Sequence, residues 1–243
     1  MISVLTITYG RPELLEEAIY SFMLQCEPDC NMVIVNDDAE TKYNFPSDKI
    51  LVCNLKNRFS SILKKLEFGF KLCKHDYIYR LDDDDLLQRG ALKNVKESIL
   101  ENPGFDVYRS SHNHWFTNNK IVDRGDNVNN GNIYTKSYLD RVNFRDESVT
   151  EDKYLTFGHD AKICSFDKPT MIYRWGMETY HISGMSTTDT KEVAEKTDEH
   201  VKDRQKGNLW LRPNFKHDYY QQVLDLENSK YAKENSHNCS VAD

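Results

Sequence analysis

Four consecutive aspartates, Asp82 to Asp85, are the residues of this chain with the clearest capacity for chemistry. They follow directly on an apolar, strand-like run, Tyr77 to Leu81. The simplest structural role is a solvated helix start, but one or two carboxylates would suffice for that. Four adjacent carboxylates repel one another, and a divalent cation with hard oxygen ligands, manganese or magnesium, would relieve the repulsion. The pattern therefore predicts a metal site at this strand end.

Three further polar signals sit where apolar runs end or a helix begins. Asp37, within Asn36-Asp37-Asp38, could accept hydrogen bonds from a nucleobase or ribose, or could simply form a turn. Tyr9 could be a stacking platform or an ordinary core or rim aromatic. Glu151 and Asp152 begin a predicted helix, where they serve either as an N-terminal acid pair or as a source of a general base.

Weaker candidates lie in the second half of the chain. His112 and His114 share one face of a predicted strand, but a metal site needs a third ligand that the sequence does not identify, which favours a surface strand. His181 and Ser183 could belong to a phosphate-contacting loop or to an ordinary turn. The chain has no Gly-rich phosphate loop and no Gly-x-Ser-x-Gly elbow, which counts against ATPases, dehydrogenases and α/β-hydrolases.

The elements that must position these residues alternate between two periodicities. Apolar, β-like runs alternate with helix-spaced apolar residues through the first hundred residues; the strands are predicted at 3–9, 32–35, 50–53 and 77–81, and the helices from Pro12, over 62–73 and over 86–100. This order predicts an α/β fold with a mostly parallel central sheet and helices on both faces. Ligands bind at the carboxyl ends of such strands, so the motifs far apart in sequence should meet in one crevice.

The remainder of the chain is less regular. The sequence predicts a strand at 105–110, a hairpin turning at Asn118-Asn119, a helix over 151–164, a strand at 170–175, a charged helix over 187–206, and a short helix at 218–226 before a polar, frayed end. We therefore divide the chain into residues 1–102, 103–186 and a C-terminal helical extension, 187–243.

Composition sets the broad class. The 243 residues are 39% hydrophobic and 29% charged, as in a globular protein that buries one large core. The net charge of −7 provides no broad basic surface for nucleic acid or anionic membrane. No apolar run approaches the ~20 residues of a membrane span, the start does not resemble a signal peptide, and the six cysteines are scattered. We therefore expect a cytoplasmic protein with reduced thiols and no membrane span.

The motifs together resemble family 2 glycosyltransferases of the GT-A fold. The opening segment 3–15, with Thr8-Tyr9-Gly10-Arg11-Pro12, is similar to that family's first strand and turn, although Gly10 replaces the usual Asn. Val33 to Ala39 is similar to its Val-Val-Asp-Asp-Gly-Ser segment, and Tyr77 to Asp85 to its form of the Asp-x-Asp motif. Thr150 to Leu155 resembles its Glu-Asp segment, and Ile172 to Trp175 with His181-x-Ser183 its closing strand and loop. The resemblance extends over roughly residues 1–186.

The resemblance implies the transfer of a sugar from a nucleoside-diphosphate sugar, such as a UDP-sugar, to a hydroxyl acceptor with inversion of configuration. It assigns the metal to Asp84 with Asp82, and the general base to Asp152. It assigns donor binding to Thr8, Tyr9, Arg11, Asp37, Asp82 and Asp83, and it makes His181 and Ser183 loop residues near the phosphates. The basic residue that often precedes the metal strand could be Arg58, Lys64 or Lys65.

Other functions remain open at this point. One alternative is nucleotidyl transfer onto a sugar phosphate, although that class usually has a Gly-rich first turn. A second is a non-catalytic module that binds nucleotide sugars. The acceptor is expected to be a glycan, with protein or modified nucleic acid as alternatives. We also expect the segment from Thr187 onward to pack across the acceptor side of the crevice.

Overall fold

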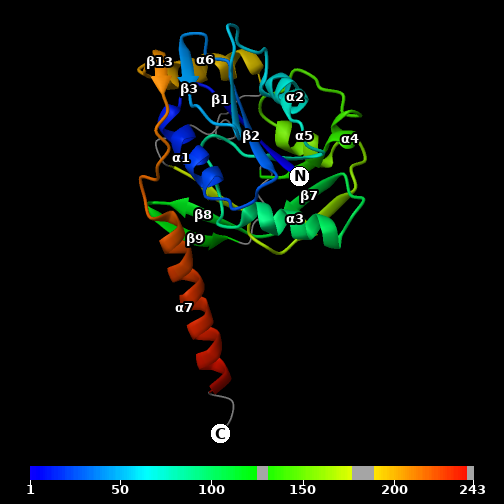
Figure 1. The fold of residues 1–243 in the computed structure, drawn as a ribbon, viewed down its shortest axis with the longest axis vertical. Coiled ribbons are helices and arrows are strands. Elements are labelled where there is room, and N and C mark those ends of the chain that lie inside the picture. The colour runs from blue at the N-terminus through cyan, green and yellow to red at the C-terminus, as the bar shows by residue number, and fades with distance from the viewer. Residues whose placement is uncertain (125–130, 177–188, 240–243) are drawn as a thin grey trace.

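A computed structural model describes residues 1–124, 131–176 and 189–239, with a central sheet and a long C-terminal helix that projects from the body (Figure 1). The central sheet has seven strands, in the order β11 (Ile163–Phe166), β7 (Val107–Ser110), β10 (Ile133–Thr135), β5 (Tyr77–Arg80), β1 (Ile2–Thr8), β2 (Cys30–Asn36) and β4 (Ile50–Asn54). Only β10 runs antiparallel to its neighbours. The expected mostly parallel α/β sheet is therefore confirmed.

Helices cover both faces of this sheet because the central strands carry apolar side chains on both faces. On one face, Val4 and Ile34 pack in a cluster with α1 (Pro12–Met23) and α3 (Ala91–Glu101). On the other, Leu5 and Val35 pack with α2 (Ile62–Leu72), α4 (Lys136–Leu139) and α5 (Glu151–Phe157). Strands buried on both faces read as continuous hydrophobic runs, which is why their positions could be predicted.

A second sheet has the order β6 (Leu86–Leu87), β12 (Met171–Arg174), β8 (Asn113–Thr117) and β9 (Lys120–Arg124). The hairpin between β8 and β9 turns at Asn118 and Asn119, both with positive φ, as the sequence predicted. The helix predicted over 86–100 is wrong at its start. Leu86 and Leu87 are fully buried and pair with β12, and the helix begins only after Gly90, whose φ is +74°.

The helix predicted over 151–164 is also too long. It ends at Phe157, because His159 and Asp160 have positive φ and the chain then returns to the central sheet as β11. The C-terminal extension holds two helices, α6 (Thr190–His200) and α7 (Tyr219–Cys239). Between them lies β13 (Gly207–Trp210), which pairs in parallel with β3 (Thr41–Asn44), so the extension is not purely helical. Helix α7 also continues well beyond the predicted Leu226.

Candidate functional site

The carboxyl ends of β1, β2 and β5 meet at one edge of the central sheet. Thr8 ends β1 directly beside Asn36, which ends β2. A pocket with an empty volume of about 590 Å³ opens there, lined by Ile7, Thr8, Tyr9, Arg11, Asp37, Arg58, Phe59, Ser60, Ser61, Ile62, Lys65 and Ser148, and by four residues of α6. The strand ends thus bring together Thr8, Tyr9, Arg11 and Asp37, which are separated in the sequence, as expected for a parallel sheet.

The aspartate run lies at the same edge, directly after β5. Asp82, Asp84 and Asp85 each offer a carboxylate oxygen, and these oxygens all lie within 4.8 Å of one another. Asp85 is fully buried, and its burial and the neighbouring Asp84 and Asp82 carboxylates raise its pKa well above the usual range. A cluster of hard oxygen donors under mutual repulsion fits a divalent cation, which would offset the repulsion. Asp85 was not among the metal ligands expected from the sequence.

Asp83, the remaining aspartate of the run, pairs with an arginine. Its carboxylate pairs with the Arg11 guanidinium, which also donates to Asp84 Oδ2 at 2.9 Å. Burial raises the pKa of Asp83 to about 6, although the charge of Arg11 opposes the rise. Arg11 therefore offsets part of the negative charge of the run while it lines the pocket.

Arg174, at the end of β12, holds the backbone of the aspartate run from behind. Its guanidinium is fully buried, donates to the carbonyl oxygens of Asp83 and Asp84, and pairs with Glu17 of α1. Its backbone N–H donates to Asp85 Oδ1 at 2.9 Å. A buried ion pair with its hydrogen bonds satisfied can fix one conformation, and here it fixes the backbone path of the aspartate run.

Arg80, the last residue of β5, connects the aspartate run to the predicted general base. It is 2% exposed, and its guanidinium pairs with Asp82 at 3.1 Å, with Glu151 at 3.2 Å and also with Asp152. The Glu151 side chain is 9% exposed and that of Asp152 is 28% exposed. Burial raises the pKa of Glu151, although the charge of Arg80 opposes the rise. The more accessible carboxylate of the pair is therefore Asp152.

Asp37 is held from two sides. Its Oδ2 accepts a hydrogen bond of 3.0 Å from the backbone N–H of Phe59, and its Oδ1 pairs with Lys65 of α2. The Lys65 ammonium also donates to the carbonyl oxygen of Thr8 at 2.7 Å. Burial lowers the pKa of Lys65, although the charge of Asp37 opposes the shift. Of the three basic residues left open by the sequence, Lys65 contacts Asp37, Arg58 lines the pocket, and Lys64 instead bonds Glu67 and the carbonyl of Phe144.

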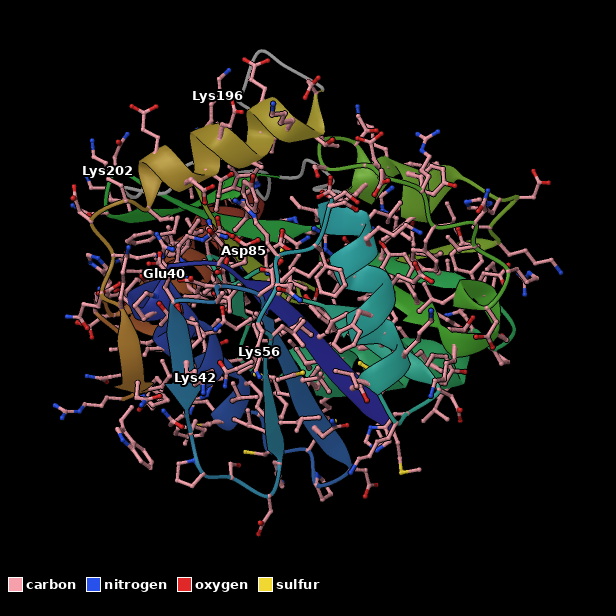
Figure 2. The ribbon with its side chains drawn as sticks, turned by 90° about the horizontal axis from the view of Figure 1, so that it is seen from above. Glu40, Lys42, Lys56, Asp85, Lys196 and Lys202 are labelled. Carbon is pink, nitrogen blue, oxygen red and sulfur yellow. The ribbon has the colours of Figure 1, made fainter. Side chains whose placement is uncertain are left out.

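The C-terminal extension closes over this pocket. Thr190, Val193, Ala194 and Thr197 of α6 line it, and Asp198 accepts a hydrogen bond of 2.6 Å from the Tyr9 hydroxyl. Asp198 also pairs with Arg58, whose guanidinium lies 4.1 Å from the centroid of the Tyr9 ring. Lys196 and Lys202 lie along the outer edge of the molecule, whereas Asp85 lies within the body (Figure 2).

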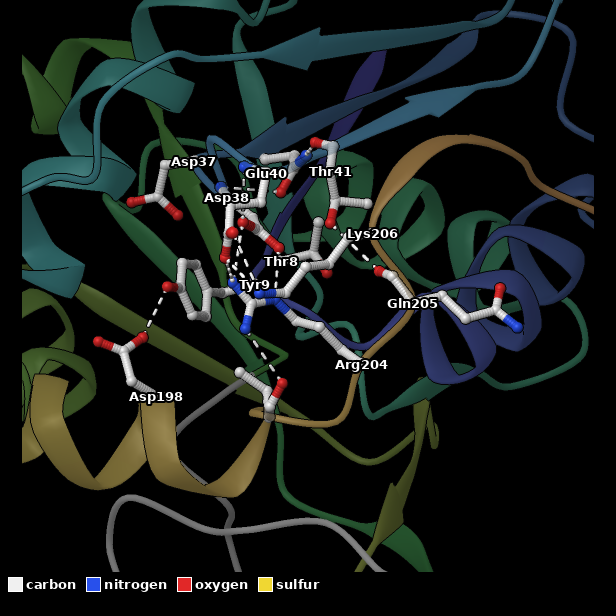
Figure 3. A network of polar contacts seen from close by, with 12 residues as sticks. Thr8, Tyr9, Asp37, Asp38, Glu40, Thr41, Asp198, Arg204, Gln205 and Lys206 are labelled. Carbon is white, nitrogen blue, oxygen red and sulfur yellow. Dashed lines mark hydrogen bonds and ion pairs between the residues drawn. The ribbon is translucent and has the colours of Figure 1, made fainter.

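Arg204 anchors the segment that follows α6. Its guanidinium makes two hydrogen bonds to Asp38, of 2.7 and 3.1 Å, and a third to Glu40 (Figure 3). Burial raises the pKa of Asp38, but the hydrogen bonds from Arg204, the Glu40 backbone and Thr41 together with the charge of Arg204 lower that pKa overall. Gly10 has a φ of +67°, and a Cβ there would lie 2.5 Å from Arg204 Cδ and 3.0 Å from Val201. The departure from the usual Asn at this position thus has a physical reason.

These contacts bear on the expected course of the extension. The sequence predicted that it would cross the acceptor side of the crevice, and this stays a prediction. Within the described residues α6 and Arg204 contact Tyr9, Asp38, Glu40 and Arg58, whereas α7 packs on the second sheet. His181 and Ser183 lie outside the described residues. Arg80, Arg174 and Arg204 were missed by sequence reasoning; the signal for the first two was an arginine at the end of an apolar strand.

The chain was compared with protein-family models, curated proteins and solved structures. The model of the family described as glycosyl transferase family 2 matches residues 3–155. The chain belongs to this family. A search of curated proteins by sequence gives no significant match.

Solved structures of GT-A glycosyltransferases share the fold. TarS 1–349 of S. aureus in complex with UDP-GlcNAc matches with a TM-score of 0.62 and 18% identity, over 85% of this chain and 68% of that one. TarS 1–349 without a named ligand matches over 71% of this chain, which spans 60% of its length. The mannosyltransferase PcManGT of Pyrobaculum calidifontis, in complex with GDP-Man and Mn²⁺, matches with a TM-score of 0.51 and 12% identity, over 70% and 56%.

None of the helices in the described ranges has the length and apolar content needed to cross a membrane.

Proposed function

We propose that this chain transfers a sugar from a nucleoside-diphosphate sugar to an acceptor hydroxyl, with inversion of configuration. One observation carries the proposal: the pocket at the strand ends adjoins the carboxylate cluster, and Arg11 belongs to both, since it lines the pocket and pairs with Asp84. A donor of this class needs a nucleoside pocket beside a site that stabilises negative charge on a diphosphate. Membership of family 2 supports the same reaction.

The pocket at the strand ends is the proposed nucleoside site. The Tyr9 ring and the Asp37 carboxylate border it, and α6 supplies its outer wall. TarS structures hold UDP-GlcNAc and UDP, and the mannosyltransferase holds GDP-Man, which supports a nucleotide-sugar donor here. We propose a UDP-sugar as the donor, with Thr8, Tyr9 and Asp37 in contact with the nucleoside.

The carboxylate cluster is the proposed metal site. Asp82 and Asp84 would hold manganese or magnesium together with Asp85, because the three oxygens are already grouped. The ion would supply Lewis-acid stabilisation of the departing diphosphate. Asp83 pairs with Arg11 beside the proposed metal position, and Arg174 bonds to the backbone of the aspartate run. The Arg11 cation and the carboxylates are therefore held in place before a donor binds.

Asp152 is the proposed general base. It would accept the proton of the acceptor hydroxyl as that oxygen attacks the anomeric carbon and the bond to the diphosphate breaks. Arg80 pairs with both Asp152 and Asp82, and so fixes the base relative to the metal site. Glu151 is buried against the same arginine and is less able to reach an acceptor.

The test is product analysis with UDP-sugars, Mn²⁺ and candidate acceptors, in which water serves as a minimal acceptor. Glycosyl transfer from a UDP-sugar releases UDP. Nucleotidyl transfer consumes UTP and a sugar phosphate and releases pyrophosphate, so it is assayed separately with that pair of substrates. Asp152→Asn is expected to lower turnover about a hundredfold or more, the usual loss for a removed general base, with UDP affinity nearly unchanged. Glycan, protein and modified nucleic acid acceptors are compared in parallel, and a glycan is expected to react.

Asp106→Asn is the matched control, because Asp106 is also paired with an arginine, Arg141. It directly precedes β7 and so lies at the amino ends of the parallel strands, whereas the site lies at their carboxyl ends. It should leave turnover unchanged. Normal turnover in Asp152→Asn would move the base elsewhere, with Glu151→Gln the next variant to test. Binding of UDP-sugar with neither transfer nor hydrolysis would indicate a non-catalytic module.

A further inference from the structure

The second sheet carries a separate group of ligand-type side chains, which sugar transfer does not use. His114 lies in β8, and His112 precedes it by two residues, so both face the same side. Asp123 of β9 lies directly opposite His114 in the antiparallel register. One ligand atom from each of the three lies within 4.8 Å of the others, and His112 Nε2 is 2.7 Å from Asp123 Oδ1. The structure therefore supplies the third ligand that the sequence could not identify.

His114 is buried without full hydrogen bonding. His114 is 1% exposed, and its Nδ1 makes no hydrogen bond within the described part of the chain. A buried polar atom without a partner is destabilising, and a bound ion or water is one way in which such an atom is satisfied. Burial and the adjacent His112 lower the pKa of His114 to about 4.

Asp123 is oriented toward the histidines from outside. Its Oδ2 pairs with Lys230 of α7, while its Oδ1 faces His112. Metal ligands are commonly fixed in this way by a second partner that leaves the ligating atom available. The lysine belongs to the helix that projects from the body, so the same carboxylate joins the hairpin to α7.

We propose that His112, His114 and Asp123 form a zinc-binding site, with a fourth position open to water. Two imidazoles and one carboxylate are a donor set that suits Zn²⁺, whereas the all-oxygen cluster of the aspartate run suits Mg²⁺ or Mn²⁺. Zinc at this position would tie β8 to β9 and, through Asp123 and Lys230, to the middle of α7. This inference does not depend on the proposed sugar transfer.

The test uses the full chain at pH 7, stripped with chelator and titrated with ZnCl₂ by calorimetry. CoCl₂ serves as a second probe, because cobalt bound by imidazole nitrogens gives visible d–d absorption bands. To exclude the aspartate run, both titrations are repeated in Asp84→Asn. One equivalent of zinc and the cobalt bands are expected to persist in that variant.

The ligand variants are His112→Asn and His114→Gln, and each is expected to weaken zinc binding on the order of a hundredfold relative to the wild type. Lys230→Met is expected to weaken zinc binding about tenfold relative to the wild type. The His112 side chain is 25% exposed, so its variant should fold even where the buried His114 variant does not. His75→Gln is the matched control, since His75 is also buried with an unbonded Nδ1 but belongs to no such cluster. Wild-type zinc affinity in His112→Asn, or no zinc binding by the wild type, would overturn the proposal.

Discussion

Replacing Gly10 by alanine tests how the C-terminal extension is held at the pocket beside the strand ends. Gly10 has a φ of +67°, where an L-residue costs roughly 1–2 kcal/mol. The added Cβ would also lie 2.5 Å from Arg204 Cδ and must displace it. Arg204 is bonded to Asp38, with side chains 8% and 1% exposed, and weakening a charged hydrogen bond of this kind adds about 1.5–3 kcal/mol. We expect a total loss of about 2.5–5 kcal/mol in the free energy of unfolding.

Gly90→Ala separates the two contributions. Gly90 has a φ of +74°, and no described residue distant in the chain has an atom within 4 Å of the position that its Cβ would take. Its replacement should therefore cost only the backbone strain, about 1–2 kcal/mol. Urea unfolding followed by tryptophan fluorescence measures both variants, with the slope of the transition compared to ensure that the same surface is exposed.

A double-mutant cycle with Arg204→Ala completes the test, because that change removes the atom nearest to the new Cβ. In the Arg204→Ala background, the cost of Gly10→Ala should fall toward that of Gly90→Ala. Equal losses for Gly10→Ala and Gly90→Ala in the wild-type background would show that the extension does not pack on Gly10. An unchanged cost in the Arg204→Ala background would refute the assigned contact.

Three further outcomes are expected. Arg80→Lys keeps the charge but not the fork that reaches three carboxylates, so turnover should fall about tenfold or more with UDP affinity retained, measured by steady-state kinetics and calorimetry. Lys65→Met leaves the buried Asp37 unpaired and should cost about 3–5 kcal/mol in urea unfolding. The pKa of Asp38 is lowered in the folded state, so its ionised carboxylate stabilises the fold at pH values above the unfolded pKa of about 3.9. This contribution to the free energy of unfolding is lost as the pH falls through the folded pKa. The free energy of unfolding should therefore fall less steeply with acid in Arg204→Met.

The sequence alone determined the central sheet and the edge at which the site lies. Strands buried on both faces leave continuous apolar runs, and a parallel sheet places ligands at their carboxyl ends. Asp37 and the run Asp82 to Asp85 could therefore be selected as polar residues at the ends of apolar segments, and Glu151-Asp152 as an acid pair at a helix start. The choice of Asp84 and Asp152 within these groups came from the resemblance to family 2 glycosyltransferases. The boundaries that were wrong, at Leu86 and Phe157, lie where pairing with a distant strand overrides local helical spacing.

Only the tertiary structure decided which lysine and arginine side chains pair with these carboxylates. Arg80 reaches Asp152 across 72 residues, and Arg204 reaches Asp38 across 166. No local pattern encodes such pairs, because any of the 32 lysines and arginines could in principle approach a given acid. The same holds for the third ligand beside His112 and His114, which the hairpin register supplies from the partner strand. Gly10 reads in the sequence as a departure from the family pattern, and its reason lies in Arg204, which occupies the space of a side chain from nearly 200 residues away.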